Sequence, residues 1–161
     1  MSKYQIGSHA YAAVKTFAGE FSWLSNFAPV EVFLDGMQYP SVEHAYAAAK
    51  TMDMAERRLI QGLPSAGRAK RYGRRLKLRE GWEALKLPVM ENLLRQKFVE
   101  GSELAAKLLQ TGEAELVEGN HWRDNFWGVQ LPCGEGQNHL GRLLMLIRSE
   151  LSSNTKTGEA Q

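Results

Sequence analysis

The sequence predicts a mainly helical fold with a small β part, formed by a single domain with a short hairpin near the N-terminus. Helix signals dominate after residue 40, whereas runs rich in β-branched and aromatic residues are few and short. The length of 161 residues suits one domain with one sizeable core, and no internal repeat or linker divides the chain. These observations favour one compact, mostly helical domain.

Short strands are expected mainly in the first quarter of the chain. Residues 14–17 (VKTF) and 30–34 (VEVFL) have the β-branched and aromatic composition of strands. Asp35-Gly36 is a tight-turn signal, so residues 37–40 (MQYP) should return as the second strand of a hairpin. One more short strand is expected at 115–119.

Helices are expected over the remainder, with bounds given by start and stop signals. Pro40 and Ser41 supply the break and the N-cap of the first helix, and Gly62 and Gly112 end two others. Pro88 should kink or split the longest helix. The expected helices span residues 41–52, 54–62, 64–76, 80–101, 102–112 and 140–151.

The domain itself is expected over residues 14–151, with weakly ordered termini at 1–13 and 152–161. Between the last strand and the last helix, residues 120–138 should form a long irregular loop. Such a loop is unusual in a small compact domain and is often functional.

Composition narrows the class of protein. Hydrophobic content of 43% and charged content of 24% exclude disordered and collagen-like classes. No apolar run approaches the ~20 residues of a membrane span, and the N-terminus lacks the layout of a signal peptide. One cysteine, Cys133, permits no internal disulfide, so we expect a cytoplasmic protein. Because the net charge is only +2, affinity for phosphates must come from a local patch.

Residues 39–50 (YPSVEHAYAAAK) combine an acid, an imidazole and a lysine with little bulk between them. Glu43 and Lys50 share a helix face, on the order of 10 Å apart along the axis, and the lysine leans back toward the acid. The alanines at 47–49 leave space there for a ligand about the size of a sugar. Glu43 should be ionised unless it is buried, because the helix dipole favours a carboxylate by about 0.3–1 kcal/mol. Alternatively, the alanines only pack tightly and Lys50 faces solvent.

The loop at 119–138 is dense in aromatic, acidic and glycine residues. Asp124, beside Trp122, Phe126 and Trp127, could place a carboxylate in an aromatic pocket that stacks on a base or flanks a sugar cation. The alternative is that the tryptophans are core residues. Residues 134–138 (GEGQN) precede a helix, where backbone N–H groups could approach an anion; the alternative is an ordinary glycine-rich loop.

Residues 68–79 (RAKRYGRRLKLR) hold seven cations and no acid. They could form a solvated face or contact the phosphates of a nucleotide or nucleic acid. The four histidines and Cys133 lack metal-ligand spacing, and nucleotide-binding fingerprints are absent from the sequence, so we expect neither a metal nor a cofactor.

Six segments taken in order point to a known family. They are FSWLSNFAP (21–29), YPSVEHAYAAAK (39–50), GWEALKLPVMENLLRQKF (81–98), LLQTGEAELVE (108–118), DNFWG (124–128) and GEGQNHLGRLLMLIR (134–148). Together they resemble the NADAR family, also called the YbiA-like proteins, over most of residues 17–151. Pro88 is a mild departure because it interrupts the helix that carries the third segment.

The resemblance implies a YbiA-like helical fold and N-glycosidase activity. The substrates it implies are phosphorylated, amine-bearing early riboflavin intermediates or ADP-ribose attached to a guanine base. Both contain a phosphorylated ribose joined at C1′ to nitrogen, so we expect hydrolysis of that bond. Two alternatives are a module that binds ADP-ribose or NAD without cutting it, and a nucleic-acid-binding protein that uses residues 68–79. The basic stretch could also hold ADP-ribosylated nucleic acid as a substrate.

The residues that match the family's motifs receive expected roles. Glu43 should stabilise an oxocarbenium-like state and activate water, with Asp124 as the second choice. Lys50 could donate a proton to the leaving base, hold a phosphate or capture the opened sugar as a Schiff base. Asn26 should bond a ribose hydroxyl or the base, Trp127 should stack, and Phe27, His44 and Gly128 should support binding. The phosphate side is expected at Gly134, Gly136, Asn138 and Arg148.

Overall fold

The computed structural model describes residues 4–6 and 9–158, with side chains described from residue 12 onward. Contacts divide the chain into two compact units. The central unit is Ser25–Lys97, and the terminal unit joins Met1–Leu24 with Phe98–Gln161.

The central unit begins with the predicted hairpin. Strands β4 (Pro29–Leu34) and β5 (Met37–Ser41) pair antiparallel, with Val32 opposite Tyr39. Asp35 and Gly36 both take positive φ angles, 48° and 79°, which a two-residue hairpin turn requires. Val32 and Tyr39 are fully buried, so one face of the hairpin faces the core of the unit.

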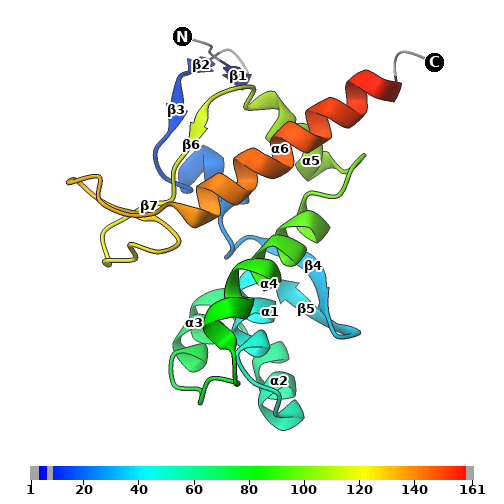
Figure 1. Cartoon of the computed structure of the whole chain (residues 1–161), viewed down its shortest axis with the longest axis vertical. Coiled ribbons are helices and arrows are strands. Elements are labelled where there is room, and N and C mark those ends of the chain that lie inside the picture. Colours follow the sequence, from blue (N-terminus) through cyan, green and yellow to red (C-terminus); the bar gives the residue numbers. More distant parts are fainter. Residues whose placement is uncertain (1–3, 7–8, 159–161) are drawn as a thin grey trace. The chain divides into compact units, whose positions relative to one another are not determined.

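Four helices complete the central unit: α1 (Val42–Ala49), α2 (Met54–Gln61), α3 (Ala66–Gly73) and α4 (Trp82–Lys97). Serine or aspartate N-caps precede the first three, as side-chain oxygens of Ser41, Asp53 and Ser65 accept amide hydrogens. All eight residues of α1 are buried, because it packs against the other three helices and both strands (Figure 1). Helix α4 continues through Pro88 as one helix, so of the expected kink or split the split does not occur, and the kink stays a prediction.

The terminal unit contains short strands and two longer helices. Strand β1 (Tyr4–Ile6) pairs antiparallel with β2 (His9–Tyr11), β3 (Ala13–Val14) pairs parallel with β6 (Glu115–Leu116), and β7 (Gly119–Asn120) pairs parallel with β8 (Val129–Gln130). A 3-10 helix, η1 (Gly19–Leu24), follows β3. Helix α6 (His139–Gly158) packs on α5 (Glu103–Gln110) and on β6 (Figure 1).

Two expectations for the terminal unit need correction. The expected strand 14–17 ends at Val14, and the expected last helix runs seven residues beyond 151. The polar residues 152–158, which suggested a frayed tail, are helical, and Ser153 and Thr157 each donate a side-chain hydrogen bond to the carbonyl four residues earlier. Residues 1–3, 7–8 and 159–161 of the expected weakly ordered termini lie outside the described residues.

The predicted class, a mainly helical fold with a small β part and an early hairpin, is confirmed. Among the described residues, helices that combine enough length with enough apolar character to cross a bilayer are absent.

Candidate active site

The loop that carries Asn26 is fastened to the first turn of α1. The amide of Glu43 donates a hydrogen bond to the carbonyl of Asn26 over 3.1 Å. The ammonium of Lys97, on α4, donates to the carbonyl of Ser25 over 2.7 Å, and the amide of Phe27 donates to the Ser25 hydroxyl over 3.1 Å. Asn26, Phe27 and Glu43, which the sequence predicts as site residues, are therefore neighbours.

The side chain of Asn26 offers an acceptor at this place. Asn26 is 8% exposed, and its Nδ2 lies 3.5 Å from the sulfur of Met90. Its Oδ1 is buried and has no hydrogen-bond donor among the described residues. Leaving a buried acceptor without a donor costs about 1–3 kcal/mol. A ligand hydroxyl or amino group would supply the missing donor.

Lys50, the C-cap of α1, shares a face with Glu43 as predicted. Its Nζ lies 5.3 Å from the centre of the Tyr46 ring, and that ring packs 5.3 Å from the ring of Trp82. Burial lowers the pKa of Lys50, the carboxylate of Glu43 opposes this, and the cations of Arg74 and Lys70 add to the lowering. The charges of Glu43 and Lys50 therefore act on one another at this site.

Helix α3 approaches α1 closely at Gly73. A Cβ added to Gly73 would lie 3.0 Å from the Cβ of Ala47 and 3.7 Å from the Nζ of Lys50. The buried stripe of α3 consists of Ala66, Ala69 and Gly73. Ala47, Ala48 and Ala49 are at most 1% exposed, so these alanines pack tightly and do not leave the sugar-sized space that the sequence suggested.

The cations of α3 and its C-terminal end fall into two rows on the helical period. The inner row, Lys70 and Arg74, borders the buried stripe, and its charges act on Lys50. The outer row, Arg68, Arg71 and Arg75, is exposed; of the inner row, Arg74 is exposed and Lys70 is half-buried. On the opposite side of the stripe, the Tyr72 hydroxyl bonds Glu56 of α2. The basic stretch therefore has two faces with different surroundings.

His44 holds α1 in place. Its Nε2 lies 3.0 Å from the carbonyl oxygen of Leu63, which can only accept, so Nε2 carries the hydrogen. Its Nδ1 then accepts from the Ser41 hydroxyl over 2.6 Å. His44 is 3% exposed and both ring nitrogens are used. The structure thus corrects its predicted contact with substrate to a positioning role.

In the terminal unit, Asp124 and Trp127 belong to a well-bonded loop. The Oδ1 of Asp124 accepts from the amides of Phe126 (3.2 Å) and Trp127 (2.9 Å). The Asn120 side chain donates to the carbonyl of Asp124 and accepts from its amide. The rings of Phe126 and Trp127 pack edge to face, 4.9 Å apart. One oxygen of Asp124 therefore shapes the loop, and its catalytic role and the stacking by Trp127 stay predictions.

Three amides of the expected anion cradle at 134–138 bond the protein. Those of Gly134, Gln137 and Asn138 donate to carbonyls of residues 125–130, as do the amides of His139 and Leu140 that follow. The Asn138 side chain bonds the backbone of Leu116 and Glu118. A Cβ on Gly136 would overlap the carbonyl of Gly128, and one on Gly128 would overlap that of Glu118, so close packing explains both glycines.

Arg148 is also committed to the protein. It is 8% exposed, and its Nη1 donates to the Thr111 hydroxyl over 2.8 Å. This bond ties α6 to the end of α5 and gives Arg148 a structural role. Its phosphate role stays a prediction.

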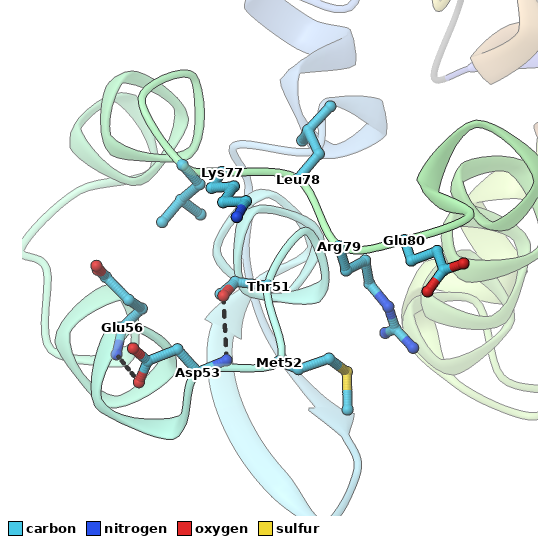
Figure 2. A pocket seen from close by; sticks show the side chains of 9 residues that line it. Thr51, Met52, Asp53, Glu56, Lys77, Leu78, Arg79 and Glu80 are labelled. Carbon is cyan, nitrogen blue, oxygen red and sulfur yellow. Dashed lines mark hydrogen bonds between the residues drawn. The ribbon is translucent and has the colours of Figure 1, made fainter.

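A separate hollow of about 560 Å³ lies beyond the C-terminal end of α1 (Figure 2). Its lining residues are Thr51, Met52, Asp53, Glu56, Leu76, Lys77, Leu78, Arg79 and Glu80. It mixes two cations with three carboxylates, and neither Glu43 nor Lys50 lines it. The amide of Arg79, one of the lining residues, donates to the carbonyl of Lys50 over 2.8 Å, and this bond holds the C-terminal end of α1.

Several residues beside Lys50 and Asn26 were not predicted as site residues. Trp82 and Met90 were expected only as part of a helix, because nothing in their local pattern distinguishes a site wall from a core stripe.

Among the described residues, clusters of three or more histidine, cysteine or acidic side chains that could hold a metal are absent.

Comparison with known proteins decides the family. The family model described as the NADAR domain matches residues 12–152. The chain belongs to the NADAR family. It is 41% identical over 135 residues to the N-glycosidase YbiA of Escherichia coli (strain K12), covering 83% of each chain. The NMR structure of E. coli YbiA matches with a TM-score of 0.77 at 36% identity, covering 89% of this chain and 85% of that one.

Of two other relatives, one is matched over most of its length and one is much longer than this chain. The chain is 34% identical over 139 residues to an N-glycosidase of Nostoc punctiforme, covering 81% of this chain and 86% of the relative. It is 37% identical over 134 residues to a riboflavin biosynthesis protein of Vibrio vulnificus (strain YJ016), covering 82% of this chain. The chain spans only 36% of that longer protein.

Proposed function

We propose that this chain hydrolyses the C1′–N bond of a phosphorylated ribosyl compound, with early riboflavin intermediates as its substrate class. The enzyme class, an N-glycosidase, rests on family membership and on relatives of that name matched over most of their length. The substrate class draws support from the Vibrio vulnificus riboflavin biosynthesis protein, of which this chain matches one part.

One observation carries the proposal. Glu43 and Lys50 lie on one face of a buried helix and their charges interact, and Asn26, whose side-chain acceptor is unpartnered, bonds the amide of Glu43 through its backbone. Cleavage of a glycosidic bond builds positive charge on the sugar, and a carboxylate stabilises that charge while it activates water. A hydroxyl or amino group of the sugar or base would satisfy Asn26.

The proton balance assigns complementary roles to the two charged groups. Glu43 takes a proton from the attacking water as oxygen bonds to C1′. Lys50, as the ammonium, gives a proton to the leaving nitrogen as the C1′–N bond breaks. The products are ribose phosphate and the free amine, and solvent returns the proton from Glu43 to Lys50. A lowered pKa makes the Lys50 ammonium a stronger acid than an ordinary lysine.

The same lowered pKa also favours a neutral amine that could attack C1′ of the opened sugar. Borohydride added during turnover separates the two routes. A Schiff base leaves a reduced sugar adduct on Lys50 that mass spectrometry detects, whereas the acid role leaves none.

The function is tested by incubating the protein with a phosphorylated, amine-bearing riboflavin intermediate and, separately, with ADP-ribosylated guanine nucleotides. Mass spectrometry should detect ribose phosphate released from the first. Absence of product from both substrates, together with tight calorimetric binding of ADP-ribose, would replace the enzyme by a binding module.

Removal of ADP-ribose from guanine in nucleic acid is a second candidate, favoured by the exposed outer row of α3. Phosphate contacts made by Arg71 and Arg75 would make affinity for a nucleic acid substrate fall steeply with salt. Replacing both by glutamine should flatten that salt dependence. A salt dependence that these substitutions leave unchanged would remove this candidate.

A further inference from the structure

We infer that Lys70 and Arg74, the inner row of α3, bind the phosphate attached to the substrate's ribose. The identity of the sugar rests on the proposed function. The family motifs suggest Arg148 and the segment 134–138 for this role, but Nη1 of Arg148 and the amides of Gly134, Gln137 and Asn138 bond the protein itself. The inner row supplies two cations whose charges act on Lys50, the residue proposed to protonate the leaving nitrogen.

Packing of α3 on α1 directs the inner row toward Lys50. Gly73 lies between Lys70 and Arg74 in the sequence and packs against Ala47 of α1, so the two cations flank this contact. Positions i and i+4 of a helix share a face, which brings Lys70 and Arg74 together. Tyr72 is held on the other flank by Glu56.

Phe27 supports the same placement. The Nζ of Lys70 lies 5.6 Å from the centre of the Phe27 ring, within cation–π range, and Phe27 is 43% exposed. Gly67, one turn before Lys70 and two turns before Arg74, also faces this ring, since an added Cβ would lie 3.8 Å from a ring carbon of Phe27. The inner row therefore borders the predicted binding residue Phe27 at one end and Lys50 at the other.

The positive charge of the inner row favours binding of an anion. The cations of Lys70 and Arg74 both act on that of Lys50, and Arg74 forms no ion pair with an acid among the described residues. A phosphate dianion relieves that repulsion and accepts charge-assisted hydrogen bonds. It also offsets the two cations that lower the pKa of Lys50, which favours the ammonium form that protonates the leaving nitrogen.

Two sources of this phosphate are compatible with the chemistry, a terminal monoester and the diphosphate of ADP-ribose. Calorimetric titration with ribose 5-phosphate and with ADP-ribose distinguishes them. The test compares wild type with Lys70→Gln and Arg74→Gln. Arg71→Gln and Arg75→Gln are matched controls, because they remove the same charges from the outer row. Thermal midpoints of the variants check that each is folded.

The inner-row substitutions should weaken binding of at least one probe about ten-fold or more, as expected for a hydrogen bond to a charged group. The outer-row substitutions should change it less than about two-fold. The assignment is overturned if substitutions in both rows weaken binding equally, or if the inner-row variants keep the wild-type affinity. It is also overturned if wild type binds neither probe. If the inner-row pattern is found but no ribosyl amine is cleaved, the phosphate site stands and the proposed function fails.

Discussion

The Nζ atom of Lys50 lies 5.3 Å from the centre of the Tyr46 ring, on the face of α1 that also carries Glu43. The lysine is therefore held over an aromatic surface instead of extending freely into water. Burial and two nearby cations lower its pKa, and Glu43 works against them. This arrangement connects the state of Lys50 to its neighbours and can be measured directly.

We predict that Arg74→Gln and Glu43→Gln shift the pKa of Lys50 in opposite directions. Removing the Arg74 cation should raise it, so the neutral amine appears only at higher pH. Removing the Glu43 carboxylate should lower it, so the neutral amine appears at lower pH. The measurement is the pH dependence of Lys50 acetylation by acetic anhydride, followed by peptide mass spectrometry, with exposed Lys15 as the internal reference. Shifts in the same direction would contradict this account of the site.

For Asn26→Ala, kcat/KM should fall about ten-fold while stability changes little. The Oδ1 has no partner to lose in the folded protein, whereas it gains one from the substrate. Steady-state kinetics and thermal unfolding separate the two effects. An unchanged kcat/KM would show that Asn26 does not contact the substrate.

His44→Ala should lower the free energy of unfolding by about 1–3 kcal/mol, because it removes the bonds that the ring makes with the half-buried Leu63 carbonyl and with the Ser41 hydroxyl. Denaturant unfolding measures this loss. His44→Gln, which can restore one of the bonds, should recover part of it. A His44→Ala variant that keeps wild-type stability but has a much higher KM would show that His44 contacts the substrate.

Arg148→Met should lower the free energy of unfolding by about 1–3 kcal/mol, because Arg148 bonds Thr111, and it should leave the affinity for ribose 5-phosphate unchanged. Denaturant unfolding and calorimetry of the same preparation test both parts. Weaker phosphate binding at unchanged stability would restore the role that the family motif suggested.

Local signals predicted much of the fold. Asp35-Gly36 predicted the hairpin and the serine N-caps predicted helix starts, because these depend on neighbouring residues alone. The end of α6 and the continuation of α4 through Pro88 depend on longer-range support, so the sequence misplaced them. The enzyme class followed from the family motifs.

The site was predictable only in part. Glu43 and Lys50 share a face through helical spacing, which the sequence states directly. Lys70 and Arg74 differ from Arg71 and Arg75 only in the side of α3 that meets α1, and Gly73 decides that side through packing. The glycine-rich segment at 134–138 resembles an anion cradle, yet its amides find carbonyl partners in the preceding loop. Such competition for hydrogen bonds is invisible in a motif.

The central claim is that Glu43 supplies the carboxylate for cleavage of the C1′–N bond. The most direct measurement is turnover of a confirmed ribosyl amine substrate by wild type and Glu43→Gln, with thermal unfolding to show that both are folded. The variant keeps the side-chain size and the backbone bond to Asn26, so turnover should fall by roughly 10²-fold or more, as expected for loss of general base catalysis. A folded Glu43→Gln enzyme that turns over within a few-fold of wild type would contradict the claim.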